Sequence, residues 1–386
     1  MSFAKWPGLP SGIESRTLTI NDLEMHILEA PAVSSGSLKP QLVVLLHGFP
    51  ELAYSWRKVI RPLAEAGYHV VAPDQRGYGR TKSAQTPDST VKYEDDMTPF
   101  RMTNLVKDIL ALVFTLGYES AAAVVGHDFG SAVAAYCALI RPDVFRAVVL
   151  MSSPFTGPPK VAGGAAQLDL RALVRDLAAL NPPRKHYVAY YSIPEANADM
   201  TGAPRGLRAF LREYYHVKSA DWVPNAPGAL AAPTAGAMAA LPHYYVMPLH
   251  ATMPEAVHGF GPSEEEIARN AWLTEEELGV YVAEYTRTGF QGGLNSYRTG
   301  SSPAWSADRE LFSGMQIEVP AMFMAGKQDW GTYQFPGAAD AMRSRACRKM
   351  EDFVLVDGAG HWVQQEKSEE VVKQLLMFFS KCARGR

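Results

Sequence analysis

The chain has 386 residues, of which 47% are hydrophobic and 20% charged, and its formal net charge is −3. A chain of this length can bury a substantial core, either as one large domain with an insertion or as two domains. The net charge is close to zero and the sequence has no run of Lys or Arg, so there is no electrostatic reason to expect nucleic acid or an anionic membrane as a partner. A small uncharged substrate is the better expectation.

Features of export and of membrane insertion are also missing from the sequence. No window approaches the ~18 consecutive apolar residues that a membrane span requires, and the amino terminus has no apolar core of signal-peptide length. Cys137, Cys347 and Cys382 are too widely spaced to suggest a disulfide framework or a zinc site. We therefore expect a soluble cytoplasmic protein that binds no metal.

In chain order, the sequence first predicts a hairpin and then alternating strands and helices. Alternating β-branched residues on either side of Asn21-Asp22 predict the hairpin. Later strands are expected as short apolar runs and helices as segments of 3.6-residue periodicity. The expected strands are 13–20, 23–29, 42–46, 69–72, a run ending at 125, 147–151, 321–325 and 353–356. The expected helices are 56–63, 102–116, 131–140 and 368–381. Such alternation is typical of an α/β fold with a mostly parallel sheet covered by helices on both faces.

The alternation stops between about residues 154 and 303. No buried strand is predicted there, only helical patterns with Tyr, Trp and Pro, and the segment is too long for a plain loop. We interpret it as an inserted helical lid. The predicted domains are residues 1–153 as the first part of the α/β core, 154–305 as the lid or cap, and 306–386 as the second part of the core.

One stretch has the pattern of a nucleophile turn. Residues 124–130 end a buried strand and continue as Gly126-His-Asp128-Phe-Gly130, which has the form Gly-x-nucleophile-x-Gly. Small flanking residues let such a strand-to-helix turn close. The central residue is an aspartate, which could instead serve as the N-cap of the following helix.

Two further polar residues follow predicted strands, Asp329 in Gly326-Lys-Gln-Asp329 and His361 in Gly360-His361. Parallel sheets place their sites at the carboxyl ends of the strands. The chain order nucleophile, acid, histidine is that of the α/β-hydrolase fold. Each residue alone could have a purely structural role in a turn or loop. All three following strands in this order argues against that for the whole set, so we predict Asp128, Asp329 and His361 as a catalytic triad.

An aspartate nucleophile restricts the chemistry. Its attack on an sp³ carbon gives an alkyl ester on Asp128, which water activated by His361 can hydrolyse while Asp329 orients His361. The leaving group must depart from carbon, so it is an epoxide oxygen or a halide. Ester hydrolysis passes through an oxyanion, and the candidate donors are the backbone N–H groups of Phe49 and Phe129.

The residues around the turn favour the epoxide. Halide release commonly uses a Trp after the nucleophile and an Asn after the first His-Gly, and this chain has Phe129 and Phe49 there. Epoxide opening needs an acid for the developing alkoxide, a role that tyrosine hydroxyls of the lid suit.

Six motifs are spread over nearly the whole chain. They are His47-Gly-Phe-Pro-Glu51, Asp74-Gln-Arg-Gly-Tyr-Gly79, Gly126-His-Asp-Phe-Gly130, Gly293-Leu-Asn-Ser-Tyr-Arg298, Gly326-Lys-Gln-Asp329 and Gly360-His361. Together they resemble the soluble epoxide hydrolases of the α/β-hydrolase superfamily.

This resemblance implies two lid tyrosines as acids and no cofactor. The Leu-Asn-x-Tyr-Arg context carries over to Tyr297, and the Tyr-x-x-x-aromatic-x-x-Pro context points to Tyr187, with Tyr190 and Tyr191 close in register. The chain departs from the family pattern at Phe129, where Trp is common, and in a longer lid near residues 224–261.

The expected function is hydrolysis of a small apolar epoxide by water to a vicinal diol, by a monomer or homodimer. The alternatives are a haloalkane or haloacid dehalogenase on the same scaffold and a non-catalytic ligand receptor of hydrolase fold.

Overall fold

The computed structural model describes residues 5–33, 40–87, 89–161 and 170–384. Its centre is a nine-stranded sheet with the order β1-β2-β4-β3-β6-β7-β10-β11, and β5 pairs with β2 outside this path. The strands are β1 (Glu14–Ile20), β2 (Leu23–Ala30), β3 (Gln41–Leu46), β4 (Tyr68–Pro73), β5 (Lys82–Ser83), β6 (Ala121–His127), β7 (Val148–Met151), β10 (Ile317–Gly326) and β11 (Cys347–Val356).

The sheet joins an antiparallel edge to a parallel body. β1 and β2 form the predicted hairpin, and β2 also pairs antiparallel with β4. From β4 to β11 all neighbours are parallel. Five of the six β3 residues are buried, as expected for a strand covered on both faces. The predicted mostly parallel sheet is therefore confirmed.

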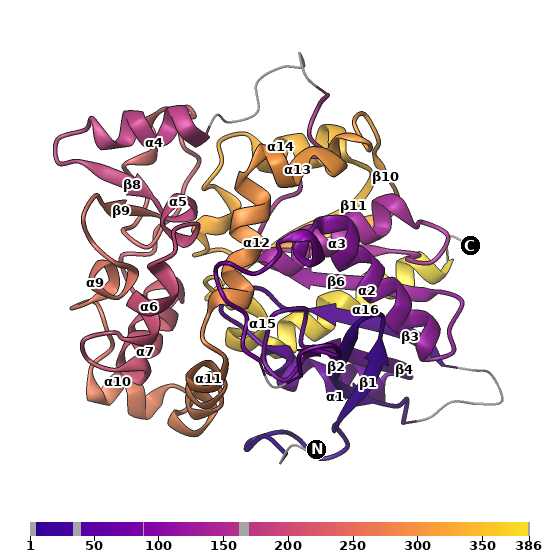
Figure 1. Cartoon of the computed structure of the whole chain (residues 1–386). Coiled ribbons are helices and arrows are strands. Elements are labelled where there is room, and N and C mark those ends of the chain that lie inside the picture. The colour runs from indigo at the N-terminus through magenta and orange to yellow at the C-terminus, as the bar shows by residue number, and fades with distance from the viewer. Residues whose placement is uncertain (1–4, 34–39, 88, 162–169, 385–386) are drawn as a thin grey trace.

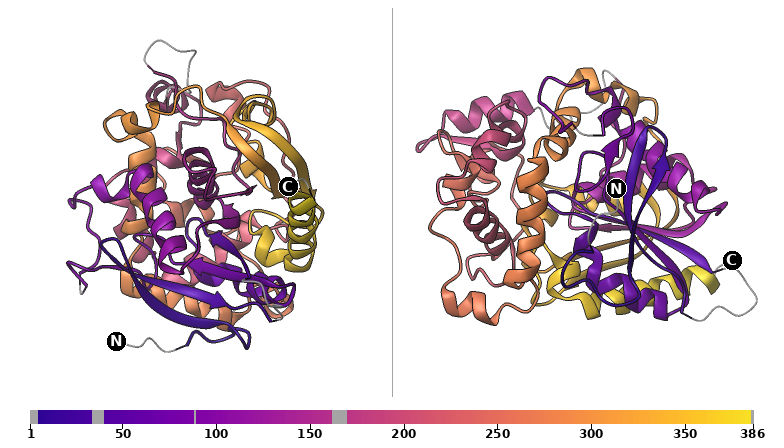
Figure 2. Two further views of the ribbon diagram at one scale, coloured as in Figure 1. Left: turned by 90° about the vertical axis from the view of Figure 1, so that its right-hand side faces the viewer. Right: turned by 60° about the horizontal axis from the view of Figure 1, so that its bottom comes forward.

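Helices cover both faces of this sheet (Figure 2). They are α1 (Arg57–Glu65), α2 (Met102–Thr115), α3 (Phe129–Ile140), α14 (Ala338–Ala341), α15 (Val363–Glu366) and α16 (Ser368–Arg384). Apolar side chains of α1 and α16 join one buried cluster, and those of α2 and α3 join the other. Two separate hydrophobic cores thus hold the sheet between the two helical layers.

A group of mostly short helices lies between β7 and β10 and forms the cap, which sits to one side of the sheet in Figure 1. Its helices are α4 (Leu170–Ala178), α5 (Tyr187–Tyr191), α6 (Ala196–Thr201), α7 (Leu207–Lys218), α8 (Ala235–Met238), α9 (Met253–Val257), α10 (Glu264–Arg269), α11 (Glu275–Thr288), α12 (Gln291–Ser301) and α13 (Pro303–Glu310). The domain boundaries after residues 153 and 305 stay predictions.

One expectation about this segment is wrong. β8 (Arg184–His186) and β9 (Val246–Pro248) pair antiparallel as a separate two-stranded sheet, and His186 and Val246 are buried. Three residues are too few to produce a visible alternation, so the sequence carried no signal for this ribbon.

Two general features bear on function. Within the described ranges, no helix is both long and apolar enough to cross a membrane. The same residues contain no group of three or more His, Cys, Asp or Glu side chains that could hold a metal ion.

Candidate active site

The predicted nucleophile turn lies between β6 and α3. Asp128 has φ 52° and ψ −118°, a backbone conformation that L residues rarely adopt. A Cβ on Gly126 would lie 2.0 Å from the Gly130 carbonyl oxygen, so the turn closes only because both flanking residues are glycines. The Asp128 side chain makes no capping hydrogen bond to α3, which argues against the N-cap interpretation. The strained turn instead directs the carboxylate toward His361.

Asp128, His361 and Asp329 come together from three strand ends. His361 Nε2 lies 3.5 Å from Asp128 Oδ2, and Nδ1 lies 3.1 Å from Asp329 Oδ1. Asp329 Oδ1 also accepts the Gly331 N–H at 2.7 Å, which orients the carboxylate. The imidazole therefore lies between the two carboxylates, with one ring nitrogen toward each.

Both carboxylates are held in the charged form. Burial by itself raises the pKa of a carboxyl group, but the hydrogen-bonding and electrostatic interactions with His361 outweigh it. The pKa values of Asp128 and Asp329 both lie below their ordinary values. The nearby ammonium of Lys218 adds to the effect on Asp128. Asp128 is thus available as an anionic nucleophile at neutral pH.

The Phe49 backbone supplies a hydrogen bond to the same carboxylate. Its N–H donates to Asp128 Oδ1 at 2.9 Å, and the Phe49-Pro50 peptide bond is cis. A Cβ on Gly48 would lie 2.4 Å from Asp128 Cβ, so only glycine allows this close approach. Phe129 directly follows the nucleophile at the start of α3. The donor role of its N–H stays a prediction.

Tyr187 and Tyr297 lie side by side in the cap. Their ring centroids are 5.9 Å apart, and the Tyr297 ring is 5.5 Å from that of Phe49. The Tyr187 hydroxyl donates to Gln334 Oε1 at 3.2 Å. Burial and the negative charge of Asp128 raise the pKa of both hydroxyls well above the ordinary value. Both tyrosines therefore remain protonated and near the nucleophile.

Neighbouring tyrosines that could be confused with them have other partners. Tyr190 donates to Asp199 Oδ2 at 3.0 Å. Tyr191 donates to the Tyr214 hydroxyl at 3.1 Å, and Tyr215 donates to the Pro50 carbonyl at 2.9 Å. Because the Tyr187 hydroxyl likewise has a partner in Gln334, the assignment of Tyr187 rather than Tyr190 or Tyr191 stays a prediction.

A buried ion pair behind the nucleophile was not anticipated. His127 Nδ1 lies 2.6 Å from Glu51 Oε2, and His127 Nε2 donates to the His361 carbonyl at 2.7 Å. Both neighbours are acceptors, so both ring nitrogens carry protons. Burial disfavours the two charges, but their mutual attraction lowers the pKa of Glu51 and raises that of His127. The only sequence signal was the position of both residues inside the conspicuous motifs.

His47 has a structural role. Its Nε2 accepts the Gln75 N–H at 3.1 Å, so Nδ1 carries the proton and donates to the Gly48 carbonyl at 2.9 Å. Burial lowers its pKa, which keeps the ring neutral. The loop before Phe49 is therefore held by a neutral histidine.

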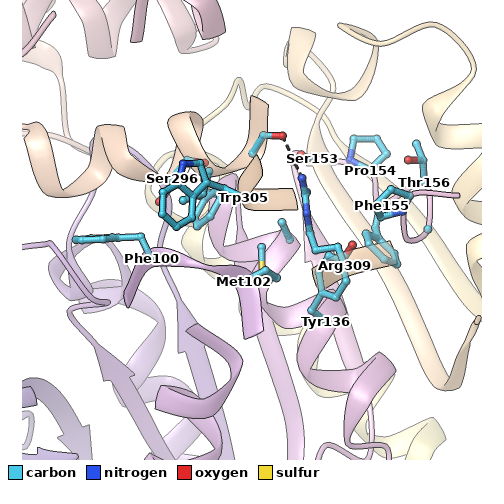
Figure 3. Close-up of a pocket in the computed structure, with 16 residues that line it drawn as sticks. Phe100, Met102, Tyr136, Ser153, Pro154, Phe155, Thr156, Ser296, Trp305 and Arg309 are labelled. Atoms are coloured by element: carbon cyan, nitrogen blue, oxygen red, sulfur yellow. Dashed lines mark hydrogen bonds between the residues drawn. The ribbon is translucent and has the colours of Figure 1, made fainter. Parts of the chain in front are cut away.

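A cavity of about 220 Å³ is lined by residues of α3, α12 and α13 (Figure 3). Phe129 and Ser296 line it, and their chain neighbours are Asp128 and Tyr297. Its other walls combine aromatic residues, such as Phe100 and Trp305, with polar ones such as Arg309.

Comparison with known proteins agrees with this geometry. Residues 41–185 match the model of the alpha/beta hydrolase fold family. Epoxide hydrolase A of Mycobacterium tuberculosis is 34% identical over 368 residues, which cover 95% of this chain and 97% of that protein. The chain belongs to the epoxide hydrolase family. Epoxide hydrolase 3 of Siraitia grosvenorii is 31% identical and covers 96% of this chain and 99% of its own.

Solved structures of family members share the fold over the full length. An epoxide hydrolase from an endophytic Streptomyces superposes with a TM-score of 0.74 at 31% identity, covering 97% of both chains. A laboratory-evolved variant of potato epoxide hydrolase gives a TM-score of 0.72 at 29% identity, covering 96% of this chain and 99% of that one. The predicted α/β-hydrolase fold with a cap is therefore confirmed.

Proposed function

We propose that this protein hydrolyses an apolar epoxide to a vicinal diol through an ester formed on Asp128. The observation that carries the proposal is that one carboxylate, that of Asp128, lies against a histidine and accepts a backbone N–H. Two cap tyrosines, whose pKa values the charge of Asp128 helps to raise, complete the set. The relatives that bear the name epoxide hydrolase support the same activity.

The two oxygens of Asp128 have different surroundings. Oδ1 already accepts the Phe49 N–H, whereas Oδ2 faces His361 Nε2. In the first step Oδ2 attacks a ring carbon, the C–O bond of the epoxide breaks, and Tyr187 or Tyr297 donates a proton to the departing oxygen. Binding next to a protonated hydroxyl lowers the cost of that developing alkoxide.

In the second step His361 takes a proton from water, and the resulting hydroxide attacks Cγ of the ester. Negative charge develops on Oδ1, where the Phe49 N–H stabilises it. The tetrahedral intermediate then expels the diol oxygen, which takes the proton from His361. The second proton of the water is left on the Asp128 carboxyl group, and its return to the tyrosinate formed in the first step restores both groups. Asp329 stabilises the imidazolium that forms in between.

A single turnover in ¹⁸O-labelled water tests the ester. The first diol should carry unlabelled oxygen, because that atom comes from Asp128, and Asp128→Asn should form no diol. Label in the first-turnover diol would exclude the covalent route. Halide release from haloalkanes or haloacids without diol formation would indicate a dehalogenase, and absence of both products would indicate a receptor.

A further inference from the structure

The loop that carries His361 is joined to the cap by backbone contacts with the end of α7. The His361 N–H donates to the Lys218 carbonyl at 2.8 Å, and the Trp362 indole N–H donates to the Tyr215 carbonyl at 2.8 Å. A Cβ on Gly360 would lie 2.5 Å from the Lys218 carbonyl oxygen. The cap and the catalytic loop are therefore packed backbone to backbone at this point.

A single carboxylate, that of Glu366 at the end of α15, closes this contact. Its Oε2 accepts the N–H groups of Gly360 and Ala220 at 2.9 and 2.8 Å, and its Oε1 accepts the Trp362 N–H at 2.9 Å. Gly360 and Trp362 flank His361, and Ala220 belongs to the cap. Burial raises the pKa of this carboxyl group to about 7, while the three backbone N–H donors favour its charged form.

This carboxylate has no competing role as an ion-pair partner. In the part of the chain that the structure describes, no basic side chain lies within salt-bridge distance of Glu366. The nearby ammonium of Lys218 packs against aromatic rings instead, 5.2 Å from the centroid of Tyr245 and 5.3 Å from that of Trp362. Glu366 is thus devoted to backbone donors on both sides of the catalytic histidine and in the cap.

We propose that Glu366 is a positioning residue that holds His361 in register with Asp128 for ester hydrolysis and ties that register to the cap. The proposal rests on the proposed role of His361 as the base. Activating water requires His361 to stand at a defined place beside Asp128, and a misplacement of about 1 Å can cost about 100-fold in rate. Ester formation uses Asp128 and the tyrosines, so it depends less on this loop.

The test separates the two half-reactions by rapid quench and intact-mass measurement of the alkyl-enzyme. Glu366→Gln keeps the shape but turns one acceptor oxygen into an NH₂ group facing an N–H donor. We expect ester hydrolysis to slow about tenfold or more while ester formation changes less than twofold, so that the ester accumulates in the steady state. Glu369→Gln, an exposed change of the same kind on α16, should leave both rates unchanged.

His361→Gln distinguishes failure of this inference from failure of the proposed function. If His361→Gln forms no ester, the proposed function is wrong. If it accumulates ester but a folded Glu366→Gln hydrolyses ester at the wild-type rate, the positioning role is wrong. Equal slowing of both half-reactions with a lowered Tm would also refute it, since that is the signature of general destabilisation.

A second variant keeps the proposal testable if Glu366→Gln does not fold. Trp362→Phe removes the indole hydrogen bond to the Tyr215 carbonyl together with part of a fully buried ring, so its Tm is measured beside both rates. Selective slowing of ester hydrolysis in this variant would support the coupling between α7 and the loop. Unchanged hydrolysis would overturn it.

Discussion

The two cap tyrosines give the most direct test of the proposed first step. Replacing Tyr187 or Tyr297 by Phe removes one hydroxyl and leaves the ring packing in place. Tyr187 is buried and Tyr297 partly buried among aromatic neighbours, and the ring centroids of Tyr297 and Tyr191 are 4.9 Å apart. The change therefore isolates the loss of a proton donor to the epoxide oxygen.

The magnitude follows from the charge that each hydroxyl would stabilise. A hydrogen bond to a charged group contributes about 1.5–3 kcal/mol, which corresponds to about 10- to 150-fold in rate. We expect each single variant to slow ester formation by that factor and the double variant to be slower than either. Tyr187→Phe should also cost about 1 kcal/mol of stability, because it leaves the buried Gln334 oxygen without its donor.

Single-turnover ester formation, followed by rapid quench and intact mass, measures this effect. Tyr190→Phe is the matched control, because its hydroxyl donates to Asp199 rather than facing the nucleophile. Ester formation at the wild-type rate in Tyr297→Phe would remove that residue from the mechanism. The same result for Tyr187→Phe would show that a neighbouring tyrosine is the second acid.

Two further predictions concern the nucleophile loop and acid stability. Gly48→Ala would bring a Cβ to 2.5 Å from Asp128 Oδ1, so we expect a loss of about 1–3 kcal/mol in chemical denaturation and at least about 100-fold in turnover. Burial opposes ionisation of Glu29, but hydrogen bonds from its histidine and arginine partners lower its pKa from 4.5 to about 2. A lowered carboxyl pKa stabilises the fold above the unfolded pKa, so up to about 3 kcal/mol should be lost as pH falls from 4.5 toward 2. Denaturation of Glu29→Gln over the same pH range should lack this dependence; an unchanged slope would refute the assignment.

The sheet was predictable because its strands carry strong local signals. β3 and β6 are continuous apolar runs of a length that only buried strands share, and their alternation with amphipathic helices restricts the topology. β8 gave no such signal, since Arg184-Lys185-His186 is polar and three residues long. Its pairing with β9 depends on contacts between segments about 60 residues apart along the chain.

The triad was predictable for a related reason. Asp128, Asp329 and His361 each follow a strand, and parallel strands bring their carboxyl ends to one edge. The ion pair of Glu51 with His127 could not be foreseen, because it joins residues 76 positions apart and depends on side-chain orientation. The residues next to Glu51 and His127 in the sequence do not show whether these two side chains are charged or neutral.

The cap contributes to both proposed steps through different helices. α5 and α12 carry Tyr187 and Tyr297, the acids of ester formation. α7 contacts the His361 loop, because the Lys218 carbonyl accepts the His361 N–H. It also contacts the loop that contains Phe49 and Pro50, because the Tyr215 hydroxyl donates to the Pro50 carbonyl. Lifting α7 away from the core would therefore break the geometry of the hydrolytic step.

We predict that substrate enters without separating α7 from the core. The cavity beside Phe129 satisfies this condition, because the core helices α2 and α3 and the cap helices α12 and α13 supply its walls, together with the loop after β7, and no α7 residue lines it (Figure 3). A bulkier side chain at Phe129 would narrow that route while leaving the backbone N–H in place. If substrate enters here, Phe129, at the position where family members often have Trp, limits which epoxides reach Asp128, and the contacts of α7 with the His361 loop are kept.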